Sequence, residues 1–128
     1  MKLLFIISGS IAAIKSLNVI KILTDKGIYI DCIVTNNAKK IINLNLLKKL
    51  TLGRTYFDSS EKNNTMLHIL LTRKNDLIVV CPATANIIAK FANGYADDLA
   101  STSMIASNKQ ILIVHYVITV ILLIFINI

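Results

Sequence analysis

The chain has 128 residues, which is enough for one domain and too few for two. Hydrophobic residues make up 55% of it and charged residues 16%, so a folded chain is expected and disorder is not the default. The net charge is +7, but the lysines form no long run and tryptophan is absent, so we interpret the basic residues as a solvated surface and predict no nucleic-acid partner.

The first elements show the periodicity of a strand, a helix and a second strand. Residues 3–8 form a short apolar run that predicts a strand buried on both faces. Ser10 is a candidate cap for the helix that follows, and Gly27 can end that helix in the left-handed conformation. The apolar positions with helical spacing between them are Ile11, Ile14, Leu17, Ile20 and Leu23. Residues 28–35 predict the second strand.

The remaining elements continue this alternation. We predict helices over residues 46–52, 83–92 and 99–106, strands over 77–81 and 111–114, and an irregular polar segment over 57–65. Strands that alternate with helices indicate parallel pairing. The fold class is therefore α/β, with a Rossmann-like or flavodoxin-like parallel sheet and helices on both faces.

The C-terminal residues 111–128 form an Ile-rich run with few interruptions, and two interpretations are open. The run is long enough for a membrane anchor, although β-branched residues also suit strands and no basic cluster follows it. We favour a shifted reading frame or an early stop. The domain then covers residues 1–114 and is incomplete at its C-terminus, with a hydrophobic tail over 115–128. Membrane association is not expected.

Small or hydroxyl-bearing residues follow three of the predicted strands, at Ser8–Ser10, Thr35–Asn37 and Pro82–Thr84. In open parallel sheets a ligand binds beyond the carboxyl ends of the strands. A phosphate can be bound at the first of these turns, which has one glycine instead of the three of a dinucleotide fingerprint. The pattern favours a mononucleotide, but an ordinary turn with a capped helix is an equally good interpretation.

Four other groups of residues are candidates for chemistry. Asn86 can exchange hydrogen bonds with a ring edge, or simply follow a proline-stopped strand. Asp97 and Asp98 can accept ligand donors, or cap a helix. His68 is a natural proton carrier, although a lone histidine is more often structural. The two cysteines lack metal-ligand spacing and lie in apolar runs, which indicates no metal site and a reducing, cytoplasmic compartment.

Taken together, four segments resemble the family of homo-oligomeric flavin-containing cysteine decarboxylases, and most closely its phosphopantothenoylcysteine decarboxylases. The segments, in chain order, are Ser8-Gly9-Ser10-Ile11-Ala12-Ala13, His68-Ile69, Pro82-Ala83-Thr84-Ala85-Asn86 and Ala96-Asp97-Asp98-Leu99. Their order and spacing extend over about the first 114 residues.

The resemblance implies FMN as cofactor, a trimer-based homo-oligomer, and a flavin site at a subunit interface. It implies oxidation of a cysteine thiol to a thioaldehyde, loss of CO2, and reduction to a thiol. The small-molecule substrate is then 4′-phosphopantothenoyl-L-cysteine and the product 4′-phosphopantetheine, in coenzyme A biosynthesis. On this resemblance His68 is the active-site histidine, and the FMN contacts are Gly9, Ser10, Thr35, Thr84, Asn86 and Asp97 or Asp98.

The sequence departs from the family pattern near its end. Where the family has Pro-Ala-Met-Asn after residue 114, this chain reads His-Tyr-Val-Ile, and the flap cysteine expected further on has no counterpart. Ile87 stands where the family usually has threonine. A non-catalytic FMN-binding fragment is therefore the main alternative. A flavin prenyltransferase-like relative is a weaker one, because that group usually has a Gly-Ala-Ser-Gly first loop.

Overall fold

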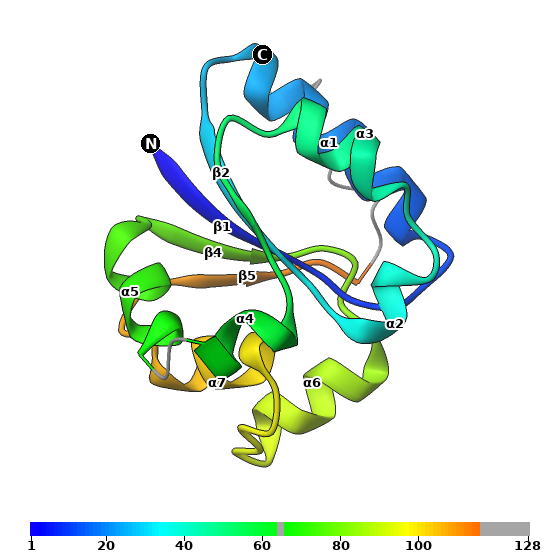
Figure 1. The fold of residues 1–128 in the computed structure, drawn as a ribbon. Coiled ribbons are helices and arrows are strands. Elements are labelled where there is room, and N and C mark those ends of the chain that lie inside the picture. Colours follow the sequence, from blue (N-terminus) through cyan, green and yellow to red (C-terminus); the bar gives the residue numbers. More distant parts are fainter. Residues whose placement is uncertain (64–65, 116–128) are drawn as a thin grey trace.

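The computed structural model describes residues 1–63 and 66–115, which form a parallel sheet of five strands between two layers of helices (Figure 1). The strands are β1 (Lys2–Ile7), β2 (Tyr29–Val34), β3 (Thr55–Tyr56), β4 (Leu77–Val80) and β5 (Ile111–Ile113). Their order across the sheet is β3-β2-β1-β4-β5, and all four neighbouring pairs are parallel. The predicted α/β fold class is confirmed.

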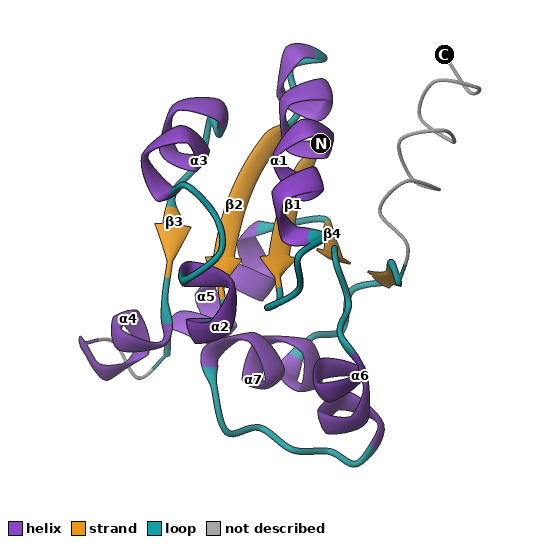
Figure 2. Ribbon diagram, turned by 90° about the vertical axis from the view of Figure 1, so that its right-hand side faces the viewer, coloured by secondary structure: helices purple, strands orange, loops and turns teal. Residues whose placement is uncertain are grey.

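The helices cover both faces of the sheet and the carboxyl ends of its strands (Figures 1 and 2). One face is covered by α1 (Ala13–Asp25) and α3 (Leu44–Leu50), and the other by α4 (Asp58–Asn63), α5 (Leu67–Lys74) and α7 (Leu99–Ala106). The short α2 (Asn36–Lys39) and α6 (Ala85–Ala92) lie beyond the carboxyl ends of the strands.

The position of strand β1 between two layers of helices explains why its sequence is apolar without interruption. Side chains alternate across a strand, so Leu3, Phe5 and Ile7 enter the core under α1, and Leu4 and Ile6 enter the core under α5 and α7. All five are at most 3% exposed. A strand that is buried on both faces needs apolar residues at every position, as the sequence predicted.

The start of α1 corrects the expected cap. Ser10 is not the N-cap: the helix begins at Ala13, Ala12 occupies the cap position, and the Ser10 hydroxyl accepts the Ala12 N–H at 3.2 Å within the preceding turn. Ile11 therefore precedes the helix and is 83% exposed, so it does not belong to the buried stripe. At the other end Gly27 has φ +79°, which confirms the predicted left-handed stop.

The segment between α3 and α5 is more ordered than its polar sequence predicts. It contains the edge strand β3 and then α4, whose first turn is stabilised by the Phe57 N–H donating to the Ser60 hydroxyl at 3.1 Å. The prediction of an irregular segment over 57–65 is therefore wrong for residues 58–63. Neither element has an apolar period, because β3 has only two residues and α4 is mostly polar.

A buried carboxylate connects three parts of the fold. Asp31 lies on β2 and is 0% exposed. Its Oδ1 accepts the Arg54 N–H at 3.0 Å, and its Oδ2 accepts from Asn75 Nδ2 at 3.2 Å and pairs with Lys74 Nζ at 3.0 Å. A charge is tolerated in a core only when it is paired and hydrogen-bonded, and these contacts meet that condition.

Most of the predicted tail lies outside the described residues, which end at His115. Within the described part of the chain, every helix is too short or too polar to cross a bilayer.

Candidate functional site

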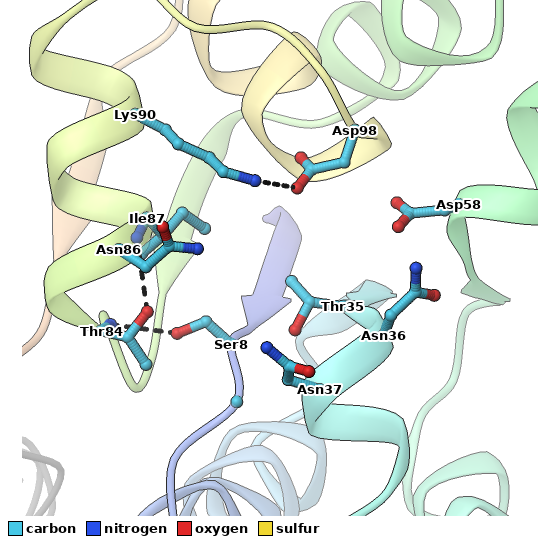
Figure 3. Close-up of a pocket in the computed structure, with 11 residues that line it drawn as sticks. Ser8, Thr35, Asn36, Asn37, Asp58, Thr84, Asn86, Ile87, Lys90 and Asp98 are labelled. Atoms are coloured by element: carbon cyan, nitrogen blue, oxygen red, sulfur yellow. Dashed lines mark hydrogen bonds and ion pairs between the residues drawn. The ribbon is translucent and has the colours of Figure 1, made fainter.

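A cavity of about 290 Å³ lies beyond the carboxyl ends of β1, β2 and β4 (Figure 3). This is where the strand order reverses, because the chain leaves β1 toward β2 on one side and later adds β4 on the other. Such switch points are where open α/β sheets bind ligands. The lining residues are Ser8, Gly9, Thr35, Asn36, Asn37, Asp58, Thr84, Asn86, Ile87, Lys90 and Asp98.

The turn after β1 approaches the start of α2 very closely. A Cβ at Gly9 would lie 2.3 Å from the Asn37 Cβ and 3.0 Å from its carbonyl carbon, so no other residue fits without a shift of backbone. Ser8 fixes the same turn from the opposite side: its hydroxyl donates to the Pro82 carbonyl and accepts the Thr84 N–H at 3.1 Å. Ser8 thus connects the ends of β1 and β4 and forms the floor of the cavity.

The part of the cavity next to this turn is polar and uncharged. Thr35 caps α2 by accepting the Ala38 N–H, and Thr84 caps α6 by accepting the Ile87 N–H, each at 3.4 Å. Each threonine keeps its own hydroxyl proton for a ligand, and the cavity is also lined by the amides of Asn36, Asn37 and Asn86. This wall offers several neutral donors, which suits a phosphate or a polyhydroxyl chain.

The opposite wall is charged. Asp98 is the N-cap of α7 and accepts the Ser101 N–H at 2.7 Å in a capping box. Its other oxygen pairs with Lys90 Nζ at 2.9 Å, and Lys90 also contacts Asp97 at 3.0 Å. Burial works against the Asp98 anion, but the hydrogen bonds from Ser101 and Lys90 outweigh it and lower the pKa of Asp98.

Asp58 contributes a second carboxylate to this wall, from the start of α4. Its Oδ1 accepts the Leu99 N–H at 3.1 Å, which connects α4 to the start of α7. Burial raises the pKa of Asp58; the Leu99 N–H opposes that shift and the negative charge of Asp98 adds to it. Asp58 and Asp98 therefore share one wall but differ in how strongly they favour the charged form.

The structure brings together five of the predicted site residues: Gly9, Thr35, Thr84, Asn86 and Asp98 all line the cavity. Ser10 and Asp97 lie beside it without lining it, Asp97 on a neighbouring depression next to α6. His68 is half-buried near the start of α5 and does not line this cavity. The roles of these residues remain predictions. Asp98 also confirms the expectation that at least one of the two aspartates caps a helix.

Two charged residues of the site were missed by the reasoning from sequence. Asp58 follows the unrecognised strand β3, and an aspartate just before a polar helical turn was the signal available. Lys90 lies four residues after Asn86, so the two share a face of α6. That spacing would have indicated Lys90 once Asn86 was chosen.

Comparison of the sequence with known protein families shows to which family the chain belongs. A model of the Flavoprotein family matches residues 1–118. The chain belongs to the Flavoprotein family. This confirms the family resemblance drawn from the four sequence segments.

Flavoprotein relatives with curated names match over most of this chain. A probable phosphopantothenoylcysteine decarboxylase of Streptococcus mutans is 33% identical over 107 residues, which cover 82% of this chain and 60% of that protein. The coenzyme A biosynthesis bifunctional protein CoaBC of Methanocaldococcus jannaschii is 37% identical over 115 residues, covering 88% and 28%. The chain thus spans three fifths of the length of the first relative and less than a third of the second.

A solved structure shows the same fold. A mutant of PPC decarboxylase complexed with pantothenoylaminoethenethiol superimposes with a TM-score of 0.76 at 28% identity, covering 86% of this chain and 63% of that one. The Flavoprotein fold is therefore common to this chain and to a PPC decarboxylase that was solved with pantothenoylaminoethenethiol.

Proposed function

We propose that this chain binds FMN in the cavity after β1, β2 and β4 and decarboxylates 4′-phosphopantothenoyl-L-cysteine to 4′-phosphopantetheine, in coenzyme A biosynthesis. The observation that carries the proposal is the placement of Gly9, Thr35 and Thr84 around one cavity at the switch point of a Flavoprotein fold. The names of the relatives supply the substrate class.

The residues present fit FMN. Gly9 lines the cavity at the first turn, and the hydroxyls of Thr35 and Thr84 and the amide of Asn86 supply donors for a phosphate or ribityl chain. About 290 Å³ is near the lower limit for a small-molecule pocket. When bound, FMN supplies a two-electron acceptor for the substrate thiol.

The chemistry of the substrate explains why such an acceptor assists decarboxylation. Oxidation of the thiol to a thioaldehyde places a carbon–sulfur double bond next to the carbon that bears the carboxylate. When the bond to the carboxylate breaks, CO2 leaves and the electron pair is delocalised onto sulfur as an enethiolate. Return of the two electrons with protons gives the thiol product, so the overall reaction needs no external oxidant. The role of the chain is to bind and orient the reactants.

The first test is the visible spectrum of the purified chain with FMN, followed by release of labelled CO2 from carboxyl-labelled 4′-phosphopantothenoyl-L-cysteine. We expect FMN binding, and an affinity about tenfold weaker in Asn86→Ala, which loses a cavity hydrogen bond. Asn93→Ala, near the end of the same helix and outside this cavity, is the matched control. Failure to bind FMN rejects the proposal. FMN binding without CO2 release favours the non-catalytic FMN-binding alternative.

We also propose that His68 acts on a ligand held by a second copy of the chain. His68 does not line the cavity of its own chain, so a catalytic His68 requires an oligomer in which α5 faces a neighbouring cavity. Such a shared site fits the trimer-based assembly that the family resemblance implies.

A mixing experiment tests the shared site. His68→Ala removes the proton carrier and Gly9→Ala disturbs the cavity, so we expect each variant alone to be inactive. Unfolded and refolded together, they form oligomers in which about a quarter of random pairings combine one intact cavity with one intact histidine. We expect activity to return to about that fraction of the unmodified protein. Activity that stays absent after mixing would show that each copy acts alone, and a fully active His68→Ala would show that His68 has no part in the reaction.

A further inference from the structure

Asp58 has an acceptor atom that the fold does not use. Its carboxylate faces the cavity from the start of α4, between Asp98 and Asn36 (Figure 3). Its Oδ1 accepts the Leu99 N–H, and within the described part of the chain no other hydrogen bond or ion pair is formed by the carboxylate. Lys90 pairs with Asp97 and Asp98 instead. One carboxylate oxygen of a half-buried residue is therefore left without a protein donor at the cavity wall.

The free oxygen of Asp58 lies at the cavity wall, so a ligand N–H or O–H group can donate to it in place of water. The two carboxylates of this wall outnumber its one lysine, so an anionic group of a ligand is disfavoured there. The opposite wall, with Thr35, Thr84 and the turn at Gly9, carries no carboxylate and offers neutral donors. The charged wall thus favours an uncharged end of a ligand, and the neutral wall favours an anionic end.

We propose that Asp58 determines specificity in this cavity by accepting a hydrogen bond from an uncharged N–H or O–H group of the ligand, so that the ligand's phosphate lies against the opposite wall. This inference rests on the proposed function, because it takes the ligand to be a flavin. It assigns Asp58 a direct contact with the ligand in addition to its contact with α7.

The test compares FMN with riboflavin, which lacks the phosphate, in Asp58→Asn. Asparagine can keep the acceptor for Leu99 and replaces the free oxygen by a donor. We expect binding of both flavins, followed by fluorescence quenching, to weaken by about tenfold with an unchanged ratio between them. Asp25→Asn makes the same change of charge in an exposed pair with Lys21 outside the cavity, and it should leave both affinities within about twofold.

The outcomes separate this inference from the proposed function. Equal affinities in Asp58→Asn and the unmodified chain would overturn the role of Asp58 and leave the flavin site intact. A selective gain in FMN affinity would also overturn it, because Asp58 would then face the phosphate. If the unmodified chain binds neither flavin, the proposed function fails and this inference fails with it.

Riboflavin affinity of the unmodified chain, measured over a series of pH values, tests the same contact. This measurement does not depend on whether a variant folds. The charged groups near Asp58 are Asp98 and Asp97 before α7 and Lys90 on α6. Burial raises the pKa of Asp58, so its anion is lost at a higher pH than that of an ordinary aspartate. Riboflavin affinity should therefore fall as the pH is lowered through this range, and Asp58→Asn should remove the fall. An affinity of the unmodified chain that does not change with pH would contradict the proposal.

Discussion

Replacement of Asp31 by alanine is expected to lower the free energy of unfolding by about 3 kcal/mol. The change removes the acceptor for the buried Asn75 amide and for the Arg54 N–H, and it leaves Lys74 without its carboxylate partner. Most of the loss comes from these unsatisfied donors, because the Lys74 side chain is 38% exposed and can be solvated. Urea unfolding followed by circular dichroism measures the effect as a shift in the midpoint.

The matched control is Asp25→Ala, which also removes one partner of a lysine–aspartate pair. Lys21 and Asp25 form an exposed i,i+4 pair at 2.7 Å, and such a pair contributes about 0.3–0.5 kcal/mol. Asp31→Asn should lie between the two, since an amide oxygen can still accept the Arg54 N–H. Equal shifts for Asp31→Ala and Asp25→Ala would show that the buried network does not stabilise the fold.

Substitution of Gly9 by alanine is expected to weaken FMN binding by at least about a hundredfold and to destabilise the chain by about 1–3 kcal/mol. The new methyl group would meet the Asn37 Cβ at 2.3 Å and the Ala38 backbone nitrogen at 3.1 Å. None of these atoms is the end of a flexible side chain, so the turn after β1 or the start of α2 has to move. Both border the cavity. Fluorescence titration of FMN checks the affinity.

Gly94→Ala is the control for general destabilisation. Gly94 has φ +71°, so alanine there is strained by about 1–2 kcal/mol, but nothing lies within 4 Å of its added methyl group. Gly94 does not line the cavity, and we expect FMN affinity to stay within about twofold of the unmodified chain. If the two variants lose FMN binding equally, the close approach at Gly9 has no special role in the site.

The strong periodic segments made most of the fold predictable. Helix α7 has the predicted bounds, 99–106, and β1, β2, β4 and β5 lie within one residue of the predicted strands or inside them. Periodicity fails where an element is too short to show a period, as in β3, or too polar, as in α4. The start of α1 was misplaced because Ser10 has the residue type of a cap, whereas the chain first makes a turn, with the Ala13 N–H donating to the Ser10 carbonyl, and the helix begins at Ala13.

The uncharged wall of the site was predictable because its residues directly follow recognisable strands. Of the charged wall, Asp98 was predicted, whereas Asp58 and Lys90 were not. Asp58 and Asp98 become neighbours only because α4 and α7 lie side by side, and the hydrogen bond from Leu99 to Asp58 joins residues 41 positions apart. The role of Asp31 was hidden for the same reason, since its partners Arg54 and Asn75 lie 23 and 44 positions away. Sequence motifs report local geometry, and these contacts depend on how the whole sheet is assembled.

The Ser8 hydroxyl, which bonds to the Pro82 carbonyl 74 residues further along the chain, has a consequence during protein synthesis. The pairing of β1 with β2 needs only residues 2–34 of the chain. The hydrogen bond between Ser8 and Thr84 at the floor of the cavity can form only after Thr84 has left the ribosome, and the charged wall is complete only after Asp98 has done so. A nascent chain therefore carries an incomplete binding site until Asp98 has been translated.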